Sequence, residues 1–403
     1  MTRVNFRLRK CSLSGIICHS FSQGFNMSFN IQAHKDKFPS DPRFGAGPSL
    51  VPVSYVEKLA ATGAHLLGTS HRKPAVRNLV KGIQDGLRSY FKIPDDYKIV
   101  LGNGGATFLF DMISFGLVEK KALHYTCGEF SDKWYKSSCV IPWTETDKKA
   151  AEYGKGITPK ADDEYDLIAC TLNETSTGVI VPEFPKVGEE TLLTVDATSG
   201  GGQVPCDISQ VDLYFFSPQK VFASEGGLYV AIMSPKAVKR AMKLHEESQN
   251  ESEPRFIPHF MSWKTALDNG EKNQTYNTPS ISTLFFLHEQ MKEMEALGFN
   301  KVLELANLKA EHVYGWAEEK PYLSCYVEEK IYRSNAVATI DVDSKVDVSG
   351  IIKALEEEKV VYGIDAYRKL GRNQFRIALF HNISLEDLKK LTSLLSALIE
   401  ENL

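Results

Sequence analysis

The 403-residue sequence lacks the features that mark membrane proteins and disulfide-rich proteins. No apolar run approaches the roughly 18 residues that a membrane-spanning helix needs. The seven cysteines are scattered and form no CxxC pair, which argues against a cysteine-rich zinc site and against a disulfide framework. We therefore expect a soluble protein of a reducing compartment, with no metal site.

An excess of positive charge is also missing. The 47 Lys and Arg residues are balanced by 51 Asp and Glu residues, so the net charge is −4. Nucleic-acid-binding domains usually carry a basic surface, so we expect neither a nucleic-acid nor a membrane partner. A hydrophobic content of 43% is ordinary for a folded protein, and the length fits two domains.

Acidic residues are absent from the N-terminal end, where the first one is Asp36. Residues 1–26 instead carry serines and four basic residues, Arg3, Arg7, Arg9 and Lys10. This pattern is typical of an organelle transit peptide, and the alternative is an upstream start codon with Met27 as the working initiator. On either interpretation we expect residues 1–26 to be disordered. The expected location is cytoplasmic, or organellar if the leader is real.

Short apolar runs alternate with helix-length amphipathic stretches between about residues 54 and 235. Helices are predicted at Gly105–Leu117 and Phe130–Ser138. The runs predict six strands: Tyr97–Leu101, Ala122–Thr126, Asp166–Thr171, Thr191–Val195, Asp212–Phe216 and Gly227–Met233. This alternation indicates an α/β domain with a mostly parallel sheet, in which ligands bind beyond the carboxyl ends of the strands.

The last third of the chain has a different pattern. Its predicted elements are helices near Ser280–Leu297 and Val302–Lys320, a strand at Asn335–Val342, a helix at Val348–Glu358, a strand at Gln374–Leu379 and a final helix that starts at Ser384 with a capping-box-like sequence. These elements indicate a smaller α+β domain. We expect an N-terminal arm at 27–53, a large domain at 54–285 and a small C-terminal domain at 286–403.

Lys220 follows directly after one predicted strand, in the stretch Ser217-Pro218-Gln219-Lys220. A lysine in an apolar, partly enclosed setting has a lowered pKa and can form a Schiff base with a carbonyl. The alternative is a solvated loop lysine.

Two further features lie at strand ends. Asp196 ends the strand Thr191–Val195, where a buried carboxylate needs a cation or several donors, and the pyridinium nitrogen of pyridoxal phosphate is such a cation. The glycine-rich stretch Gly102–Thr107 follows a strand and opens a helix, which is a favourable position for a phosphate. Taken singly, the first could be a turn aspartate and the second a glycine-rich turn. Their order along one sheet, together with Lys220, is much more specific.

With these residues in place, the chain resembles the phosphoserine aminotransferases, which are class V pyridoxal-phosphate enzymes with the fold-type I, aspartate-aminotransferase-like architecture. The resemblance runs from about Phe44 to the C-terminus. The stretches that carry it are Phe44-Gly45-Ala46-Gly47-Pro48-Ser49, Ser70-His71-Arg72, Gly104-Gly105-Ala106-Thr107, Asn173-Glu174-Thr175, Gln219-Lys220, Asn277-Thr278-Pro279 and Arg376. Many members of the family carry an arginine in the phosphate turn, and this chain does not.

The resemblance implies how the cofactor, pyridoxal 5′-phosphate, is held. Lys220 would carry it covalently and move the substrate proton, and Asp196 would pair with its ring nitrogen. Thr175 would bind near the ring, and Trp134 would stack on it, with Phe130 as the second choice. The residues implied for the cofactor phosphate are Gly105, Ala106 and Gln219, with Asn277 and Thr278 reaching across from the second subunit of a homodimer.

The resemblance also implies the substrate contacts. Arg376 would bind the α-carboxylate, because its planar guanidinium matches a carboxylate with two hydrogen bonds. His71 and Arg72 would bind the substrate phosphate. Without the resemblance, the sequence would indicate only that Arg376 is an arginine at a sheet edge and that His71 and Arg72 are a solvated pair in a loop.

The expected activity is transamination between glutamate and 3-phosphohydroxypyruvate, giving O-phosphoserine and 2-oxoglutarate for serine biosynthesis by a ping-pong mechanism. One alternative is another class V activity, either alanine–glyoxylate transamination or cysteine desulfuration. The desulfurase interpretation is disfavoured by Gln219, where desulfurases usually have histidine, and by Cys325 in a strand-like stretch. A second alternative is a non-catalytic pyridoxal-phosphate-binding dimer. The sequence leaves open whether 4-phosphohydroxythreonine is a further substrate.

Overall fold

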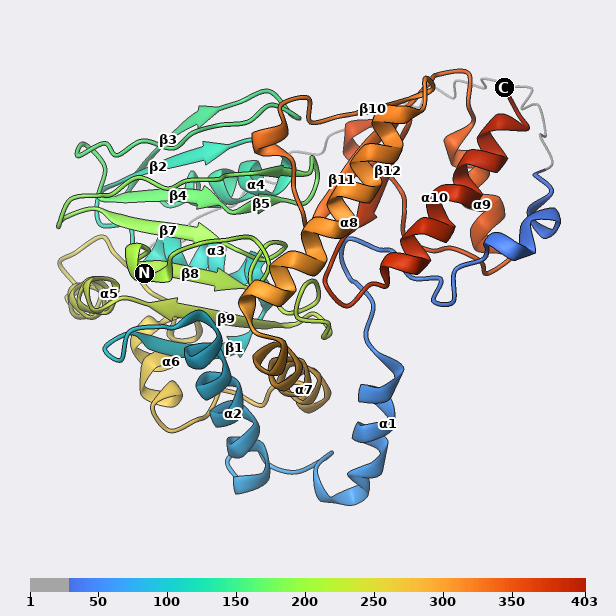
Figure 1. The fold of residues 1–403 in the computed structure, drawn as a ribbon. Helices are drawn as coiled ribbons and strands as arrows, with labels where there is room; N and C mark the ends of the chain where they lie inside the picture. Colours follow the sequence, from blue (N-terminus) through green and yellow to red (C-terminus); the bar gives the residue numbers. More distant parts are fainter. Residues whose placement is uncertain (1–28) are drawn as a thin grey trace, which may run out of the picture.

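A seven-stranded sheet with helices on both faces forms the larger part of the protein, and a three-stranded sheet forms the smaller part (Figure 1). The structure is a computed structural model that describes residues 29–403. The predicted leader at 1–26 lies outside these residues. Within residues 29–403, no helix is both long and apolar enough to span a bilayer.

Six of the seven strands in the large sheet are those expected from the apolar runs. In spatial order the strands are β1 (Lys98–Asn103), β9 (Leu228–Met233), β8 (Leu213–Phe216), β7 (Leu192–Asp196), β4 (Leu167–Thr171), β2 (Lys121–Thr126) and β3 (Glu145–Ala150). Neighbours are parallel except at β9, which runs antiparallel to both β1 and β8. The edge strand β3 was not predicted, because its sequence is polar and largely exposed.

Both faces of this sheet are buried, which explains why its strands are continuously apolar. Successive residues of β8 enter opposite cores: Phe215 packs with Trp134 in one core, whereas Phe216 packs with Phe222 in the other. The first face is covered by α3 (Gly105–Gly116), α4 (Glu129–Ser138), α5 (Pro235–Glu247) and α6 (Trp263–Gly270). The second face is covered by α2 (Pro74–Phe91) and α7 (Ile281–Leu297).

The C-terminal part is the smaller α+β unit that the sequence predicts. Its sheet is antiparallel, in the order β10 (Leu323–Cys325), β11 (Val337–Val342) and β12 (Gln374–Ala378), and its helices are α8 (Phe299–Glu319), α9 (Val348–Glu357) and α10 (Leu385–Glu400). Ser384 caps α10 by accepting a hydrogen bond from the backbone of Asp387 at 3.3 Å. The expected boundary near residue 285 falls inside α7, so the division into domains stays a prediction.

Short elements complete the chain. They are α1 (Val53–Ala61), the two-residue strands β5 (Asn173–Glu174) and β6 (Val179–Ile180), and the 3₁₀ turns at Ile31–Lys37, Gly63–His65, Ile208–Gln210, His259–Met261, Lys330–Tyr332 and Arg368–Leu370. Helix α8 runs obliquely across the small sheet, where it packs on β10 and β11 and reaches α7, and α9 and α10 lie at the side away from the large sheet (Figure 1).

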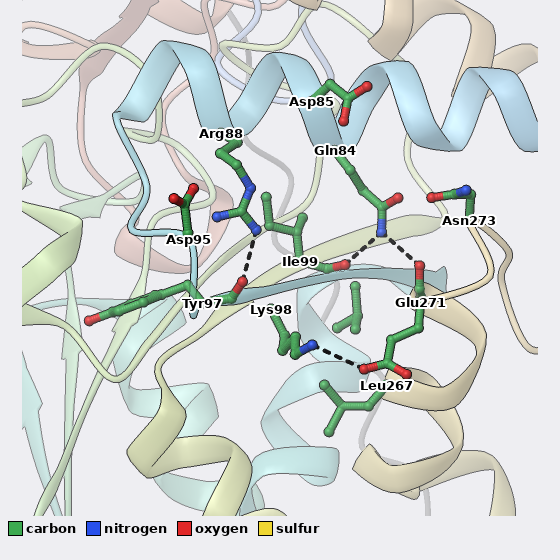
Figure 2. Close-up of a pocket in the computed structure, with 12 residues that line it drawn as sticks. Gln84, Asp85, Arg88, Asp95, Tyr97, Lys98, Ile99, Leu267, Glu271 and Asn273 are labelled. Carbon is green, nitrogen blue, oxygen red and sulfur yellow. Dashed lines mark hydrogen bonds and ion pairs between the residues drawn. The ribbon is translucent and has the colours of Figure 1, made fainter.

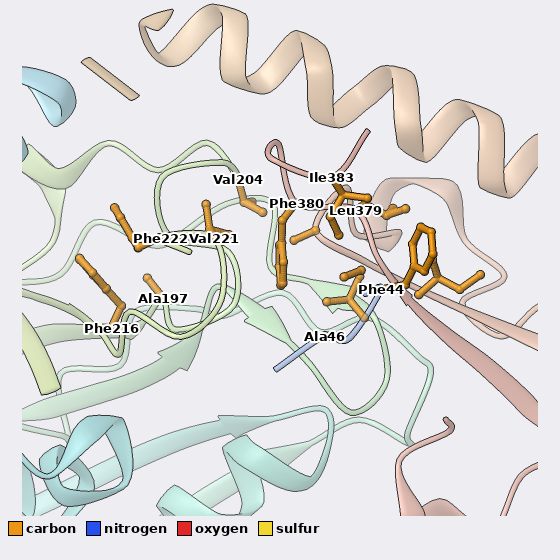
Figure 3. Packing of buried hydrophobic residues seen from close by; sticks show 14 of the residues in the cluster. Phe44, Ala46, Ala197, Val204, Phe216, Val221, Phe222, Leu379, Phe380 and Ile383 are labelled. Atoms are coloured by element: carbon orange, nitrogen blue, oxygen red, sulfur yellow. The ribbon is translucent and has the colours of Figure 1, made fainter. Parts of the chain in front are cut away.

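The N-terminal segment around Phe44 joins the two parts of the molecule. Phe44 and Ala46 are buried near residues 379–383 on one side and the segment around Phe222 on the other (Figure 3). The Phe44 carbonyl accepts a hydrogen bond from Ala378 at 3.0 Å, and the Ser49 amide donates to the Gln219 carbonyl at 3.0 Å. This segment therefore connects the end of β12 to the loop that carries Lys220.

Candidate active site

A cavity of about 190 Å³, partly open to solvent, lies beyond the carboxyl ends of β4, β7 and β8. It brings together the glycine-rich turn, the strand-end aspartate and the strand-end lysine, as the sequence predicts. The residues that line it are Gly104, Gly105, Ala106, Thr107, Phe110, Phe130, Thr171, Asn173, Thr175, Asp196, Thr198, Ser199, Ser217, Gln219, Lys220 and Gly227.

A second cavity of similar size lies where α2 and α6 meet β1, and several of its polar side chains are already paired (Figure 2). Lys98 pairs with Glu271 at 3.0 Å, Gln84 donates to the Ile99 carbonyl at 2.7 Å, and Arg88 donates to the Tyr97 carbonyl at 2.8 Å. These groups have structural partners, so this cavity offers little for chemistry.

Lys220 is buried at the floor of the first cavity, with 6% of its surface exposed. Its Nζ donates a hydrogen bond to Thr175 Oγ1 at 2.8 Å and lies 5.1 Å from the centre of the Phe130 ring. Burial, reinforced by the positive charge of Arg376, lowers the pKa of Lys220 to about 7 against the opposing effect of Asp196. The amine is therefore substantially neutral, and so nucleophilic, near neutral pH.

The N-terminal segment packs directly on this lysine. Gly47 has φ +143°, and a Cβ there would lie 2.6 Å from Lys220 Cε, so only glycine leaves room for the lysine side chain. Ser49 Oγ donates to the Lys220 carbonyl at 2.9 Å. The stretch Phe44–Ser49 thus helps to enclose and orient the lysine, a role that the sequence alone did not indicate.

Asp196 ends β7 with its carboxylate buried at 4% exposure. It accepts hydrogen bonds from the Thr198 amide at 2.9 Å and the Thr198 hydroxyl at 2.5 Å. Burial raises the pKa of Asp196 to about 6, although these bonds oppose the shift. Among the described residues it forms no ion pair, so a cation bound in the cavity would stabilise its charged form.

The glycine-rich turn meets the requirements of a phosphate site. Gly104 and Gly105 have φ values of +120° and +69°, and together with Ala106 and Thr107 they place the first turn of α3, whose amides have no partner within the helix, at the wall of the cavity. Three lining atoms, Thr171 Oγ1, Asn173 Oδ1 and Gln219 Oε1, are buried without a hydrogen-bond partner in the structure. An anion cradle, an amine, a carboxylate and unpaired polar atoms are the groups that pyridoxal phosphate needs, so these residues fit the cofactor.

The choice of Trp134 as the ring-stacking residue is not supported by the structure. Trp134 does not line the cavity: it is 1% exposed and stacks on Phe110 in the core, at 5.4 Å and 11° between rings. Phe130, one helical turn earlier, lines the cavity instead. Both residues lie on one face of α4, but only its first turn reaches the cavity, so Phe130 replaces Trp134 in the proposed site.

The residues predicted to bind substrate lie outside the cavity, unlike most of those predicted to bind the cofactor. Arg376, on β12, is half-buried, its Nε has no partner, and burial lowers the pKa of its guanidinium. The guanidinium lies 5.6 Å from the ring of Tyr367, which in turn contacts Phe130 edge-on at 5.5 Å. The charge of Arg376 influences Lys220, yet Arg376 does not line the cavity.

The remaining predicted residues form a patch outside the cavity. His71 Nδ1 lies 3.2 Å from Thr278 Oγ1, and the Asn103 side chain donates to Asn277 Oδ1 at 3.0 Å. Arg72 is exposed beside them. The structure thus places the predicted phosphate-binding pair next to the segment expected to act across subunits.

Several residues in and around the site were not predicted from the sequence, among them Thr171, Asn173 and Thr198, which line the cavity, and Glu174 and Tyr367, which contact Phe130. Glu174 belongs to the Asn-Glu-Thr stretch that carries the family resemblance, which is the signal that could have identified it, but the resemblance implies a role for Thr175 alone. Tyr367 lies in an irregular segment before β12 without a recognisable pattern.

The chain matches the class-V aminotransferase family over residues 134–363. A phosphoserine aminotransferase of Nocardioides sp. is 42% identical over 371 residues, which cover 91% of this chain and 97% of that enzyme. The solved structure of a phosphoserine aminotransferase from Cytophaga hutchinsonii superposes with a TM-score of 0.79 and 26% identity, covering 89% of this chain and 99% of that one. The chain therefore belongs to the phosphoserine aminotransferase family.

Aminotransferases outside this family have the same fold. An alanine–glyoxylate aminotransferase from Nostoc sp. superposes with a TM-score of 0.73 at 20% identity, covering 89% of this chain and 95% of that one. The architecture confirms the expected fold-type I aminotransferase, and the choice between activities depends on the sequence relatives and the site.

Proposed function

We propose that this protein transfers an amino group from glutamate to 3-phosphohydroxypyruvate, giving 2-oxoglutarate and O-phosphoserine for serine biosynthesis. The observation that carries the proposal is the buried Lys220, whose pKa is lowered to about 7, in a cavity that also holds Asp196 and the Gly104–Gly105 turn. The 42% identity to a phosphoserine aminotransferase supports the choice of substrate.

The cofactor is pyridoxal 5′-phosphate, which supplies an electron sink for the substrate α-carbon when bound. Lys220 would take the proton from the α-carbon and return it, because a pKa of about 7 leaves about half of its amine neutral near pH 7. Asp196 would stabilise a positive ring nitrogen, and the amides of the Gly104–Gly105 turn would bind the phosphate. Phe130 would cover one side of the ring. Glutamate and 3-phosphohydroxypyruvate would react in turn at this one site, which is ping-pong kinetics.

Arg376 is the proposed clamp for the substrate α-carboxylate. Its buried, unpartnered Nε needs an acceptor, and its charge already influences Lys220. A carboxylate bound there would place the neighbouring α-carbon near the Lys220 amine. It would also compensate the effect of the guanidinium charge on the lysine.

We propose a homodimer in which Asn277 and Thr278 reach the cofactor phosphate of the other subunit. Both residues are exposed and absent from the cavity of their own chain. Because Thr278 lies within hydrogen-bond distance of His71, the His71–Arg72 pair would approach the second site from the same subunit. The proposed location is the cytoplasm, or an organelle if residues 1–26 act as a transit peptide.

The alternatives are other class V activities and a non-catalytic cofactor-binding dimer. A desulfurase needs a mobile, reactive cysteine. Cys325 instead lies in β10, where its backbone pairs with that of Ile340 in β11, and burial raises the pKa of its thiol. A non-catalytic binder would not need Lys220, Asp196 and Arg376 together.

The test is a half-reaction of the cofactor-loaded protein with one amino donor at a time. Phosphoserine alone should discharge the visible absorption of the bound cofactor and release stoichiometric 3-phosphohydroxypyruvate. Serine and alanine should react much more slowly, because they lack the phosphate. A faster reaction with alanine or with cysteine would favour the corresponding alternative, and no reaction with any donor would favour the non-catalytic dimer.

A further inference from the structure

Glu174 is a fully buried carboxylate to which the proposed reaction gives no role. It lies in β5, directly before Thr175, with 0% of its surface exposed. It forms no ion pair with any side chain in residues 29–403. A buried carboxylate of this kind is unfavourable unless several groups donate hydrogen bonds to it. The donors that surround Glu174 therefore indicate its role.

The first donors are backbone amides at the start of α4. The residue before this helix is Gly128, which has no side chain to cap the free amides. Glu174 reaches across from β5 instead and accepts from the amides of Phe130 at 3.2 Å and Ser131 at 2.9 Å. A Cβ on Gly128 would overlap Glu174 Cγ, so the glycine provides the space for this contact. Negative charge is favourable at this end of a helix.

The Ser131 hydroxyl of α4 also donates to Glu174 Oε2, at 2.9 Å, and the remaining donors belong to the strand segment that carries Thr175. Glu174 Oε1 accepts from the Ser176 amide at 3.2 Å and the Ser176 hydroxyl at 2.7 Å, and Ser176 Oγ accepts from the Glu129 amide at 3.0 Å. The first turn of α4 and the segment 174–176 are therefore one hydrogen-bonded unit. Thr175 and Phe130, one from each part of the unit, are both neighbours of the Lys220 amine.

We propose that Glu174 is a positioning residue that holds Phe130 over the cofactor pocket by tying the start of α4 to the Thr175 segment. The proposal rests on the proposed function, because it assumes that the pocket binds pyridoxal phosphate. Glutamine at position 174 has the same shape but accepts with one oxygen instead of two. At least one α4 amide would then lose its acceptor, and the turn that carries Phe130 would be released.

The test is a double-mutant cycle on the affinity of the apoprotein for pyridoxal phosphate, measured by equilibrium dialysis. We expect Phe130→Ala and Glu174→Gln each to weaken binding about three- to tenfold, the range of an aromatic contact. If Glu174 acts through Phe130, adding Glu174→Gln to Phe130→Ala should weaken binding little further. Losses that multiply in the double variant, or no loss in Glu174→Gln, would overturn the proposal.

Asp132→Asn is the matched control. Asp132 is also in the first turn of α4, but its carboxylate pairs with Lys136 and Lys148 at 2.7 Å instead of holding Phe130. Its removal should lower the melting temperature without weakening cofactor binding, and a loss of affinity equal to that of Glu174→Gln would overturn the proposal. The cycle uses no substrate. A protein that binds the cofactor but does not react with phosphoserine would therefore contradict the proposed function and leave the role of Glu174 standing. A parent protein that binds no cofactor would overturn both.

Discussion

Two lysines are almost completely buried in the part of the chain that the structure describes, and burial lowers the pKa of each to about 7. Lys220 lies in the cavity of the large sheet. Lys309 lies on α8, where its Nζ donates hydrogen bonds to the carbonyls of Phe380 at 2.6 Å and Ile383 at 3.0 Å. By residue type, burial and pKa the two are nearly the same.

The two lysines differ in whether their amines have space and unpaired polar groups around them. Lys309 has two carbonyl acceptors and does not line any of the described cavities. Lys220 has one hydroxyl acceptor, an open cavity and the charges of Asp196 and Arg376 nearby. A lowered pKa therefore does not by itself identify a catalytic lysine. The free space and the unpaired groups around the amine make that distinction.

The largest expected effect separates the two lysines by activity. Lys220→Ala should reduce phosphoserine-dependent formation of glutamate from 2-oxoglutarate by more than about 10³-fold, since the nucleophile and the proton carrier are lost together. Lys309→Met should keep most of the activity at a temperature where it is folded. Equal losses in the two folded variants would remove the distinction between the two regions.

Arg72 extends the comparison to an exposed cation. Arg72→Ala should lower kcat/KM for phosphoserine about ten- to a hundredfold, because a charge-assisted hydrogen bond contributes roughly 1.5–3 kcal/mol. The loss should be much smaller with unphosphorylated serine, which has no group for the guanidinium to bind. Steady-state kinetics with both donors check this, and equal losses would mean that Arg72 does not recognise the phosphate.

The smallest expected effect concerns Lys309 and pH. Its pKa of about 7 in the folded protein lies below the ordinary 10.5, so the unfolded chain binds more protons between these values. The stability of the parent should therefore rise with pH above 7, relative to Lys309→Met, by up to about 1.4 kcal/mol per pH unit. Urea unfolding of both proteins at pH 7, 8 and 9 measures the difference. A difference that does not change with pH would show that Lys309 is charged in the folded state.

The sequence located several residues that line the cavity because the ends of buried strands can be recognised in a sequence. Apolar runs located six strands of the sheet, and in a parallel sheet the residues after such strands gather at one edge. Lys220, Asp196 and Gly105 were found in this way. The edge strand β3 was missed because nothing buries its polar side chains.

Other parts of the site depend on packing that a pattern does not encode. Phe130 and Trp134 share a helix face, and only the structure shows which one reaches the cavity and which one enters the core. Lys309 lies in a correctly predicted helix, yet its burial follows from the 379–383 segment, which is distant in sequence. Glu174 acts on a helix that begins 45 residues earlier in the chain, at Glu129.

Chemical trapping distinguishes the two lysines in a single experiment. The cofactor-loaded protein is reduced with borohydride, which fixes pyridoxal phosphate to the amine that holds it, and the digested peptides are mapped by mass spectrometry. The phosphopyridoxyl group should be found on Lys220, in the peptide that contains Ser217-Pro218-Gln219. A label on Lys309 or on any other lysine, or no label at all, would contradict the assignment of this cavity as the active site.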